Sequence, residues 1–474
     1  MANDNTTVSS LDARDFLAAF DLDRADIKDI CIYHENGSLI IAVELNIKNH
    51  KCPVCGSDTS KVKGYTLKKI KHSVLNPVPC IIHYRARRYI CPTCGKTFYE
   101  ENPFVLTGFK VSVATVYNVL SELKRPECTF TSVADKYNLS PSSVSNIFDN
   151  CIDIGRRPLP ECISFDEVYA FKSKDSDYVC VLLDYTNKKI IDILPSRKQR
   201  YLSDYLAAIP KKERKKVLYA SFDMWQTYRR ISKQFFPNCI CIVDKFHVLQ
   251  ELSRRFNTVR IQVMNDNWKI KEELKKKQKE LKIQNKKLDP KDYEDFNRAD
   301  INYYLLKKFN FLLTSNDYKL LDPNKEKKFN KRLSQYTNYY DLYTMMLKID
   351  PRLKEAAELK EEIYYFYRCA SYETAKAALE TLMMIYRTSN LKPFQTFVNT
   401  LTEWKSEIIN SFIVIPSINK KMNNGLIENR NKSIKLLKHS SNGYTNWDRF
   451  RNRVLYVLND DVPINISGKK VKKK

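Results

Sequence analysis

Two pairs of cysteines constrain the fold of this chain more than any other feature of its sequence. The segments Cys52-Pro-Val-Cys55-Gly56 and Cys91-Pro-Thr-Cys94-Gly95 each combine the C-x-x-C spacing with a glycine, which lets the backbone turn toward sulfur. Four thiolates from two such turns can surround one Zn²⁺ tetrahedrally, whereas a redox pair or free thiols would be the alternatives. We therefore expect a structural zinc site formed by Cys52, Cys55, Cys91 and Cys94 in a zinc ribbon.

The charge of the chain indicates the class of its partner. It contains 81 Lys and Arg against 55 Asp and Glu, and this formal net charge of +26 indicates a polyanion, with nucleic acid as the leading candidate. Basic residues crowd the stretch between the two cysteine pairs, where either contact with DNA phosphates or a solvated surface would explain them. The ribbon arginines that we regard as candidates for DNA contact are Arg85, Arg87 and Arg88.

A pair of short helices is expected after the ribbon. Residues 111–124 have the apolar periodicity of a helix, and Val133, Ala134 and Tyr137 then share one face of the next helix. Ser140-Pro141 has the form of an N-cap followed by proline at the first position of a further helix. This pattern predicts a helix-turn-helix whose last helix would enter a DNA major groove, although such helix pairs also occur as packing units. The residues expected to face DNA are Ser142, Ser143, Ser145 and Asn146.

An apolar strand expected at 162–171 carries two adjacent acids, Asp166 and Glu167. Carboxylates in an apolar strand are costly unless they hold a cation or a proton. The pattern that follows is two more strands, a helix, a strand, a helix and a strand, which is the order of a ribonuclease H-like sheet. In that sheet the first and fourth strands are neighbours, so Asp166 would lie beside Asp223 at the end of the fourth strand. Alternation along the first strand points Glu167 to the opposite face.

A third acid lies far along the chain, after a helical stretch at 255–410. Glu428 follows Asn424-Gly425 on a predicted helix and shares its polar face with Asn431 and Lys435. A lone Glu on a helix is usually solvated, so a surface role is the alternative. The polar and basic residues near Glu428 that we regard as candidates for DNA contact are Asn431, Lys432 and Lys435.

Three carboxylates of this kind suit a metal-dependent nuclease. Mg²⁺ prefers oxygen ligands, and two or three carboxylates that converge on a phosphate are what two-metal catalysis requires. Our hypothesis is that Asp166 bridges two Mg²⁺ (or Mn²⁺) ions while Asp223 and Glu428 hold one ion each. No Gly-Lys-Ser/Thr phosphate loop occurs in the sequence, which disfavours nucleotide hydrolysis.

These motifs, in this order over nearly the whole chain, resemble the ISL-three family of bacterial insertion-sequence transposases. The resemblance rests on the cysteine ribbon, the helix-turn-helix and the segments Phe165-Asp166-Glu167, Phe222-Asp223-Met224-Trp225 with Tyr228, Val243-Asp244-Lys245-Phe246-His247, and Asn424-Gly425-Leu-Ile-Glu428 with Asn431-Lys432 and Ile434-Lys435. It implies a DDE transposase with a ribonuclease H-like core, in which Asp166, Asp223 and Glu428 match the catalytic, metal-binding triad.

The resemblance also covers an accessory element and one departure from the family pattern. Asp244 and His247 match a D-x-x-H element found near the active site in several transposase groups, although Asp244 could instead cap the helix that carries His247. Where the family commonly has Glu-Gly after its Asn-Gly, this chain has Glu428-Asn429-Arg430. The carboxylate itself is retained.

The patterns and the resemblance together predict a multidomain α+β protein with an N-terminal zinc ribbon, a helix-turn-helix and a ribonuclease H-like α/β catalytic core interrupted by a large all-helical insertion. The expected domains are an N-terminal helix (around 10–20) and hairpin at 1–50, the zinc ribbon at 51–108, the helix-turn-helix at 109–155, the first part of the core at 160–254, the helical insertion at 255–415, the last part of the core at 416–460 and a basic tail at 461–474.

The predicted function is that of a DNA transposase that binds the terminal inverted repeats of an insertion sequence and catalyses metal-dependent strand cleavage and strand transfer. Its partners would be the double-stranded DNA of the repeats and of the target, and synapsis of two ends would need a homodimer or a higher oligomer. Neither a secretion signal nor an apolar run of ~18 residues is present, so we expect a cytoplasmic, nucleoid-associated bacterial protein without membrane contact. Two alternatives remain: a zinc-ribbon and helix-turn-helix regulator with a degenerate nuclease core, and a structure-selective nuclease such as a resolvase.

Overall fold

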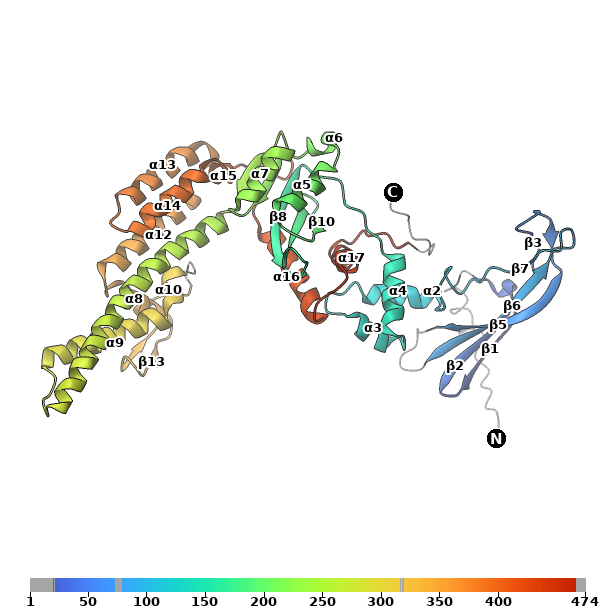
Figure 1. Cartoon of the computed structure of the whole chain (residues 1–474), viewed down its shortest axis with the longest axis horizontal. Coiled ribbons are helices and arrows are strands. Elements are labelled where there is room, and N and C mark those ends of the chain that lie inside the picture. The colour runs from blue at the N-terminus through green and yellow to red at the C-terminus, as the bar shows by residue number, and fades with distance from the viewer. Residues whose placement is uncertain (1–19, 21, 73–78, 316, 318, 466–474) are drawn as a thin grey trace.

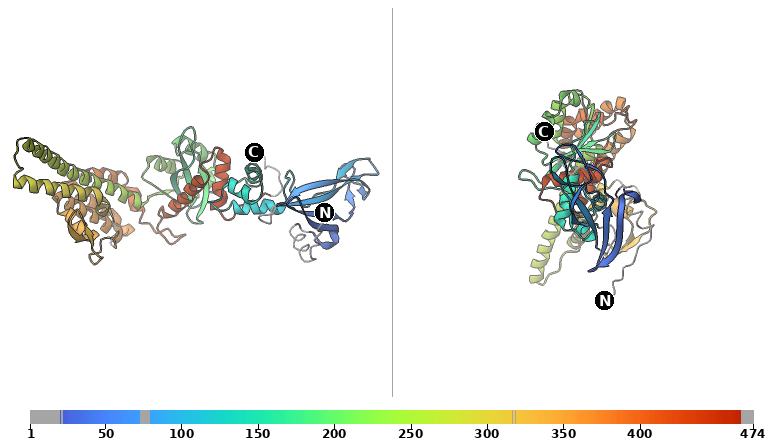
Figure 2. Two further views of the ribbon diagram at one scale, coloured as in Figure 1. Left: turned by 90° about the horizontal axis from the view of Figure 1, so that it is seen from below. Right: turned by 90° about the vertical axis from the view of Figure 1, so that its right-hand side faces the viewer.

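The structure is a computed structural model that describes residues 20, 22–72, 79–315, 317 and 319–465. The helix expected around 10–20 and most of the basic tail expected at 461–474 lie outside the described residues. The described chain is an elongated α+β structure, with a β-sheet toward one end, a bundle of helices at the other and a second, mixed sheet between them (Figure 1, Figure 2).

The N-terminal sheet contains the hairpin that the sequence predicts. Its strands are β1 (Ile27–Glu35), β2 (Ser38–Leu45), β5 (Val62–Lys71), β6 (Cys80–Ile90) and β7 (Thr97–Tyr99), in the order β1-β2-β6-β5 with β7 paired to the end of β6. β1 and β2 pair antiparallel, and the φ values of Asn36 and Gly37 are both positive, at 48° and 74°. Two such residues form a primed turn, which suits the twist of a tight hairpin. The short strands β3 (His50–Lys51) and β4 (Asp58–Thr59) flank the first cysteine pair.

Three helices follow, and the expected pair of short helices is confirmed. They are α2 (Val113–Glu122), α3 (Phe130–Lys136) and α4 (Pro141–Cys151). Each helix has an N-cap residue whose side-chain hydroxyl accepts a hydrogen bond from a backbone N–H of the first turn. These N-cap residues are Ser112 for α2, Thr129 for α3 and Ser140 for α4.

The core of these three helices is completed by the last helix of the chain, α17 (Trp447–Leu458). Tyr456 of α17 is buried, its ring packs edge-on against Phe148 of α4 with centroids 5.8 Å apart, and its hydroxyl donates to the Leu120 carbonyl at 3.0 Å. Lys124 also donates to the Asn459 carbonyl at 2.7 Å. Segments more than 300 residues apart in the sequence therefore form one core.

The central sheet has the strand order expected from the sequence. Its strands are β8 (Cys162–Tyr169), β9 (Tyr178–Asp184), β10 (Lys189–Leu194), β11 (Tyr219–Phe222) and β12 (Ile240–Val243), in the order β10-β9-β8-β11-β12. β8, β9 and β10 form an antiparallel meander, whereas β11 is parallel to both β8 and β12. The first and fourth strands are therefore neighbours, and the mixed sheet is consistent with a ribonuclease H-like core.

Helices cover both faces of the central sheet (Figure 1). One face packs on α5 (Gln199–Ala207) and α7 (Gln226–Phe235), and the short α6 (Lys211–Arg214) lies between these two in the chain. The other face packs on α16 (Gly425–Ser440) and α17. Phe165 of β8 belongs to the first core and Val168 to the second. Because side chains alternate along a strand, Asp166 points toward α16 and Glu167 toward α7.

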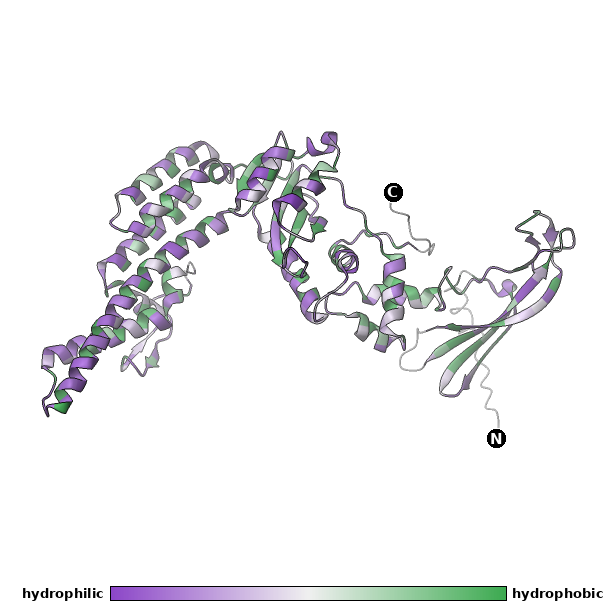
Figure 3. Cartoon of the chain, viewed as in Figure 1, coloured by the Kyte–Doolittle hydropathy of each residue, from purple (hydrophilic) through white to green (hydrophobic). Residues whose placement is uncertain are grey.

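Helices make up most of the segment between β12 and α16, where the sequence predicts a helical insertion at 255–415. This segment contains α8 (Lys245–Ile283), α9 (Pro290–Lys308), α10 (Asn310–Thr314), α11 (Tyr339–Leu347), α12 (Pro351–Cys369), α13 (Tyr372–Thr388), α14 (Lys392–Glu403) and α15 (Lys405–Asn410). α8 is one helix of 39 residues that starts at Lys245, with Asp244 at its N-cap position, and its buried positions Val248, Leu252 and Phe256 repeat at helical spacing. The outer parts of α8 and α9 are largely hydrophilic (Figure 3).

The prediction that the insertion is all-helical is wrong. β13 (Lys328–Asn330) and β14 (Gln335–Thr337) pair antiparallel as a hairpin between α10 and α11. Strands of three residues are too short to leave a recognisable alternation of polar and apolar residues. Within the described residues, no helix has both the length and the apolar character needed to cross a membrane.

Candidate active site

Asp166 lies in the middle of β8 and faces helix α16. Its Oδ2 accepts a hydrogen bond of 2.8 Å from Nδ2 of Asn431 on α16, and its Oδ1 accepts one of 2.8 Å from the backbone N–H of Glu167. Both oxygens are therefore held in fixed directions.

Asp223 follows the last residue of β11 and lies beside Asp166. The parallel pairing of β8 with β11 matches Ser164 with Ser221, and each aspartate stands two residues further along its strand. Oδ1 of Asp223 is buried and has no hydrogen-bond partner among the described residues. A buried, unpartnered carboxylate oxygen is costly, so this oxygen is available to a cation or a proton.

The surroundings make both aspartates reluctant to ionise. Burial raises the pKa of Asp166 to about 7, and the charges of Glu167 and Glu428 add to this shift, while the Glu167 N–H and Lys435 oppose it. Burial also raises the pKa of Asp223 to about 7; the charges of Glu167 and Asp166 add to the shift and Arg197 opposes it. The site therefore concentrates negative charge that a bound cation would neutralise.

Glu428 stands in the first turn of α16, and its carboxylate raises the pKa of Asp166. The start of this helix is attached to the sheet, because Ser221 of β11 donates a hydrogen bond of 2.7 Å to Oδ1 of the buried Asn424. Asn423 accepts from the Gly425 N–H at 3.0 Å. The sequence predicts Asn424-Gly425 as a helix entry, and the structure confirms it.

The three acids come from neighbouring elements, but their oxygens do not form a tight cluster. Among the described residues, the only group of three or more potential metal ligands within 4.8 Å of one another is the set of four cysteines. Asp166 and Asp223 stand on neighbouring strands and Glu428 on the helix that faces Asp166; the charge of Glu428 acts on Asp166, and that of Asp166 on Asp223. Their role as one catalytic triad stays a prediction.

Glu167 points away from Asp166, as alternation predicts, and has its own partners. Arg197 forms an ion pair with it, and the Tyr228 hydroxyl donates to its Oε2 at 3.3 Å. The Arg197 guanidinium lies over the Trp225 ring, 5.0 Å from its centroid. Arg197 was absent from the sequence-predicted site because nothing in its local sequence indicates this long-range contact.

Asp244 and His247 lie where β12 passes into α8. Asp244 is buried, and burial raises its pKa, while the N–H groups of Phe246 and Asn424 act in the opposite direction. Burial lowers the pKa of His247, and the charges of Glu428 and Glu167 oppose this shift. His247 is therefore within electrostatic reach of the acidic site. Asp244 occupies the N-cap position of α8, so both interpretations of this pair stay open.

Two of the residues predicted to contact DNA are buried inside the protein. Arg87 is fully buried, and it donates to the Asn46 carbonyl at 3.1 Å and pairs with Glu44 and Glu100 at 3.4 and 3.6 Å. The prediction for Arg87 is wrong, because this side chain neutralises buried acids. Asn431 is also buried, and its side-chain amide donates a hydrogen bond to Asp166. The prediction that Asn431 faces DNA is therefore wrong as well.

The other candidates for DNA contact remain predictions. Arg85 is exposed and pairs with Glu44 at 2.9 Å, and Arg88 is exposed and donates to Oγ1 of Thr97 at 2.9 Å. Lys432 and Lys435 are exposed on α16. On α4, Ser142 and Asn146 are exposed, whereas Ser143 and Ser145 are half-buried.

The four cysteines form a compact cluster with the geometry of a zinc site. The Sγ atoms of Cys52 and Cys94 are 3.6 Å apart, those of Cys55 and Cys91 are 3.5 Å apart, and all four lie within 4.8 Å of one another. A tetrahedron of sulfurs around Zn²⁺ has edges of about 3.8 Å. Gly56 and Gly95 adopt positive φ values of 73° and 71°, which the sequence predicts for the two turns.

Comparison with protein-family models identifies both parts of the chain. A model of DDE transposases of the ISL3 (ISL-three) type, described as a transposase, matches residues 163–454. The chain belongs to the ISL3 family of DDE transposases. A second model, described as the zinc finger of the transposases IS204, IS1001, IS1096 and IS1165, matches residues 48–94. No curated protein matches the chain.

The ISL3 family membership defines the class of chemistry. DDE transposases are polynucleotidyl transferases, so the chain is an enzyme of DNA transposition. The transposase match extends from β8 to α17 and contains the three acids together with Asp244 and His247, while the zinc-finger match contains all four cysteines. Helices α2 to α4 lie outside both matches.

Proposed function

We propose that this ISL3 transposase cleaves and rejoins DNA strands at the ends of an insertion sequence, with Asp166, Asp223 and Glu428 as the carboxylates of its reaction centre. The main support for this proposal is Oδ1 of Asp223, which is buried beside Asp166 and has no hydrogen-bond partner among the described residues. The pKa of each of these two carboxyls is raised to about 7. Such a pair needs a cation to be fully ionised at neutral pH.

The donor set fits Mg²⁺ or Mn²⁺, because all three residues offer carboxylate oxygens and Mg²⁺ accepts few protein ligands. When bound, the metal would activate a water or a 3′-hydroxyl and stabilise the leaving oxygen. The charge of Glu428 acts on Asp166, and the charge of Asp166 acts on Asp223, which supports Asp166 as the shared ligand. Asn431 would keep Oδ2 of Asp166 oriented toward α16.

The N-terminal parts would recognise DNA. The cysteine cluster would hold a structural Zn²⁺, and the exposed Ser142 and Asn146 of α4 would read the terminal inverted repeats in the major groove. We assign the central sheet with α5, α7, α16 and α17 to a ribonuclease H-like catalytic core, interrupted by the insertion from α8 to α15. Two ends would be joined in a homodimer or a higher oligomer, since one chain carries one acid set.

End-labelled DNA with the inverted repeats provides the test. The zinc-loaded protein should nick this DNA when Mg²⁺ is added and leave it intact when Mg²⁺ is omitted; omission is preferable to a chelator, which would also strip zinc. Asp166→Ala and Asp223→Ala should each abolish nicking while end binding persists. Asp204→Ala, at an exposed position on α5, is the matched control and should remain active. Unchanged nicking by either active-site variant would refute the assignment.

A further inference from the structure

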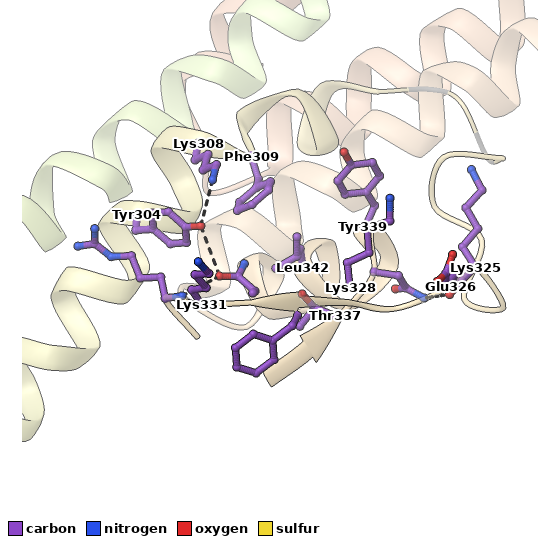
Figure 4. Close-up of a pocket in the computed structure, with 14 residues that line it drawn as sticks. Tyr304, Lys308, Phe309, Lys325, Glu326, Lys328, Lys331, Thr337, Tyr339 and Leu342 are labelled. Carbon is purple, nitrogen blue, oxygen red and sulfur yellow. Dashed lines mark hydrogen bonds between the residues drawn. The ribbon is translucent and has the colours of Figure 1, made fainter. Parts of the chain in front are cut away.

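A cavity of about 810 Å³ lies in the insertion, far along the chain from the three acids (Figure 4). The end of α9, the hairpin β13–β14 and the start of α11 form its walls. This volume is within the range that holds small organic ligands, which is about 300–1,000 Å³. The walls take no part in the site of Asp166, so the cavity needs its own explanation.

The lining is strongly basic. Its charged residues are Lys308, Lys325, Lys328, Lys331, Arg332 and Glu326. Arg332 forms an ion pair with Asp300 at 2.6 Å, but in the described part of the chain the four lysines form no ion pair. Uncompensated lysines around a cavity attract an anion.

Aromatic rings are the second component of the cavity. Tyr304 lies on one wall, where its hydroxyl accepts from Lys308 Nζ at 3.4 Å and donates to Oδ1 of Asn330 at 3.5 Å (Figure 4). Tyr339 lines the opposite part and is 41% exposed. Tyr304 also packs against the core of the insertion, whereas Tyr339 lies edge-on to Phe311, with ring centroids 5.6 Å apart, and keeps part of its ring open to the cavity.

The hairpin adds an exposed aromatic pair. Phe329 and Tyr336 are cross-strand partners with ring centroids 5.3 Å apart, and they are 54% and 68% exposed. A hairpin of two three-residue strands has little stability of its own, so two large exposed rings on it are better explained by binding than by packing.

We propose that this cavity binds an unpaired nucleotide of DNA, with the base stacked on Phe329 or Tyr339 and the flanking phosphates paired with the lysines. Base–aromatic stacking beside lysines is the usual way in which proteins hold single-stranded nucleic acid. A concave site admits a base that has left its duplex, whereas a duplex would meet only the rim. The proposal rests on the proposed function only in taking DNA as the substrate.

Binding of oligothymidylate, compared with a blunt duplex of equal length, tests the proposal. The full-length, zinc-loaded protein is titrated without added Mg²⁺, so that the result does not depend on cleavage, and fluorescence anisotropy reports binding. The double variant Phe329→Ala/Tyr339→Ala should bind oligothymidylate about 10-fold more weakly, since each stacked base contributes substantially. Its affinity for the duplex should change by less than about 2-fold.

The lysines are tested separately. Lys328→Ala/Lys331→Ala should weaken oligothymidylate binding and reduce the slope of log affinity against log salt by about 1–2. Tyr372→Ala, which removes a 47% exposed ring on α13, and Lys354→Ala/Lys376→Ala, which removes exposed lysines on α12 and α13, are the matched controls and should bind like the wild type.

Ultraviolet cross-linking gives a second readout that does not depend on the variants. Oligothymidylate should cross-link to peptides from residues 325–342. Equal losses of oligothymidylate and duplex binding would identify a phosphate-binding surface and overturn the proposal, as would unchanged binding by the aromatic variant or cross-links confined to other regions. Failure of Mg²⁺-dependent nicking would instead refute the proposed reaction centre and leave this result intact.

Discussion

At the scale of single residues, Asp166 and Asp192 are carboxylates of the same sheet in opposite electrostatic surroundings. Asp192 of β10 is buried, but it accepts from Arg451 Nε at 2.7 Å and from the Tyr205 hydroxyl at 3.1 Å. Asp166 has an amide and other acids around it, and its pKa is raised to about 7. Asp192 has a cationic partner in Arg451, whereas Asp166 would gain a close cationic partner only with a bound metal ion.

This contrast predicts that Asp166→Asn stabilises the metal-free protein while it abolishes strand cleavage. Because the pKa of Asp166 is higher in the folded chain than its ordinary value of 3.8, the folded state binds more protons between pH 4 and pH 7. The contribution of this group to stability therefore falls as the pH rises through that window. At pH 8 the substitution should raise the free energy of unfolding by about 1–3 kcal/mol.

Thermal unfolding without added Mg²⁺ measures this effect, and the gain should be much smaller at pH 4 than at pH 8. Asp192→Asn is the control: it leaves the half-buried Arg451 with a weaker partner and should lower stability by about 1–3 kcal/mol at pH 8. A loss of stability in Asp166→Asn at pH 8 would contradict the described electrostatics.

Arg87 and Arg88 are adjacent in β6 but have different environments. Arg87→Ala should destabilise the ribbon by about 3 kcal/mol or more, since it leaves Glu44 and Glu100 without their buried partner. Arg88→Ala removes an exposed guanidinium and should lower DNA affinity severalfold with little change in stability. Chemical denaturation and DNA titration of both variants separate the two effects. The opposite pattern would show that Arg87 is accessible to DNA.

At the scale of elements, the central sheet shows what can be predicted from the sequence. The strands of residues 162–243 and their order were predictable because each is a short apolar run bounded by turns, and the helices between them have a different periodicity. That order alone brings Asp166 and Asp223 onto neighbouring strands. The position of Glu428 depends on a helix that returns after the whole insertion, so strand order does not place it, and its grouping with the other two acids was a chemical hypothesis that the family resemblance strengthened.

Other features depend on long-range contacts that cannot be inferred from the local sequence. The strands β13 and β14 are too short to show an alternation of polar and apolar residues. The burial of Arg87 depends on its ion pair with Glu100, which follows the second cysteine pair in the chain. The ion pair of Arg197 with Glu167 joins β8 to the start of the α5 segment. Such contacts are set by tertiary packing, and the neighbours of Arg87 and Arg197 in sequence give no indication of them.

The zinc ribbon is an element whose folding we expect to depend on its metal. Cys52→Ser/Cys91→Ser should reduce bound zinc from about one ion per chain to nearly none. It should also abolish the protection of residues 50–100 against proteolysis, while the thermal unfolding of the central sheet changes little. Metal analysis and limited proteolysis are the measurements. Cys31→Ser, which alters an exposed cysteine outside the cluster, is the control and should retain zinc; normal zinc content in the double variant would disprove the site.

At the scale of the whole molecule, α17 connects helices α2 to α4, which we propose to read DNA, with the central sheet. Tyr456→Ala removes a buried ring from the core of α2 to α4 and should lower the free energy of unfolding by about 2–4 kcal/mol. It should also weaken end binding, because α4 loses its support at Phe148. Tyr456→Phe keeps the ring and loses only the hydrogen bond to Leu120, so its cost should be about 1 kcal/mol. Calorimetry and DNA titration compare the two, and equal effects would argue against packing as the main contribution.

The same contact has a consequence for the order of events during synthesis. Helices α2 to α4 leave the ribosome early, but Tyr456 is translated only near the end, so their shared core stays incomplete until almost the whole transposase exists. A prematurely terminated product that lacks α17 would expose Phe148 and form a poor competitor for the transposon ends. With α4 in its proposed role, stable recognition of DNA would therefore be reserved for chains that already carry Asp166, Asp223 and Glu428.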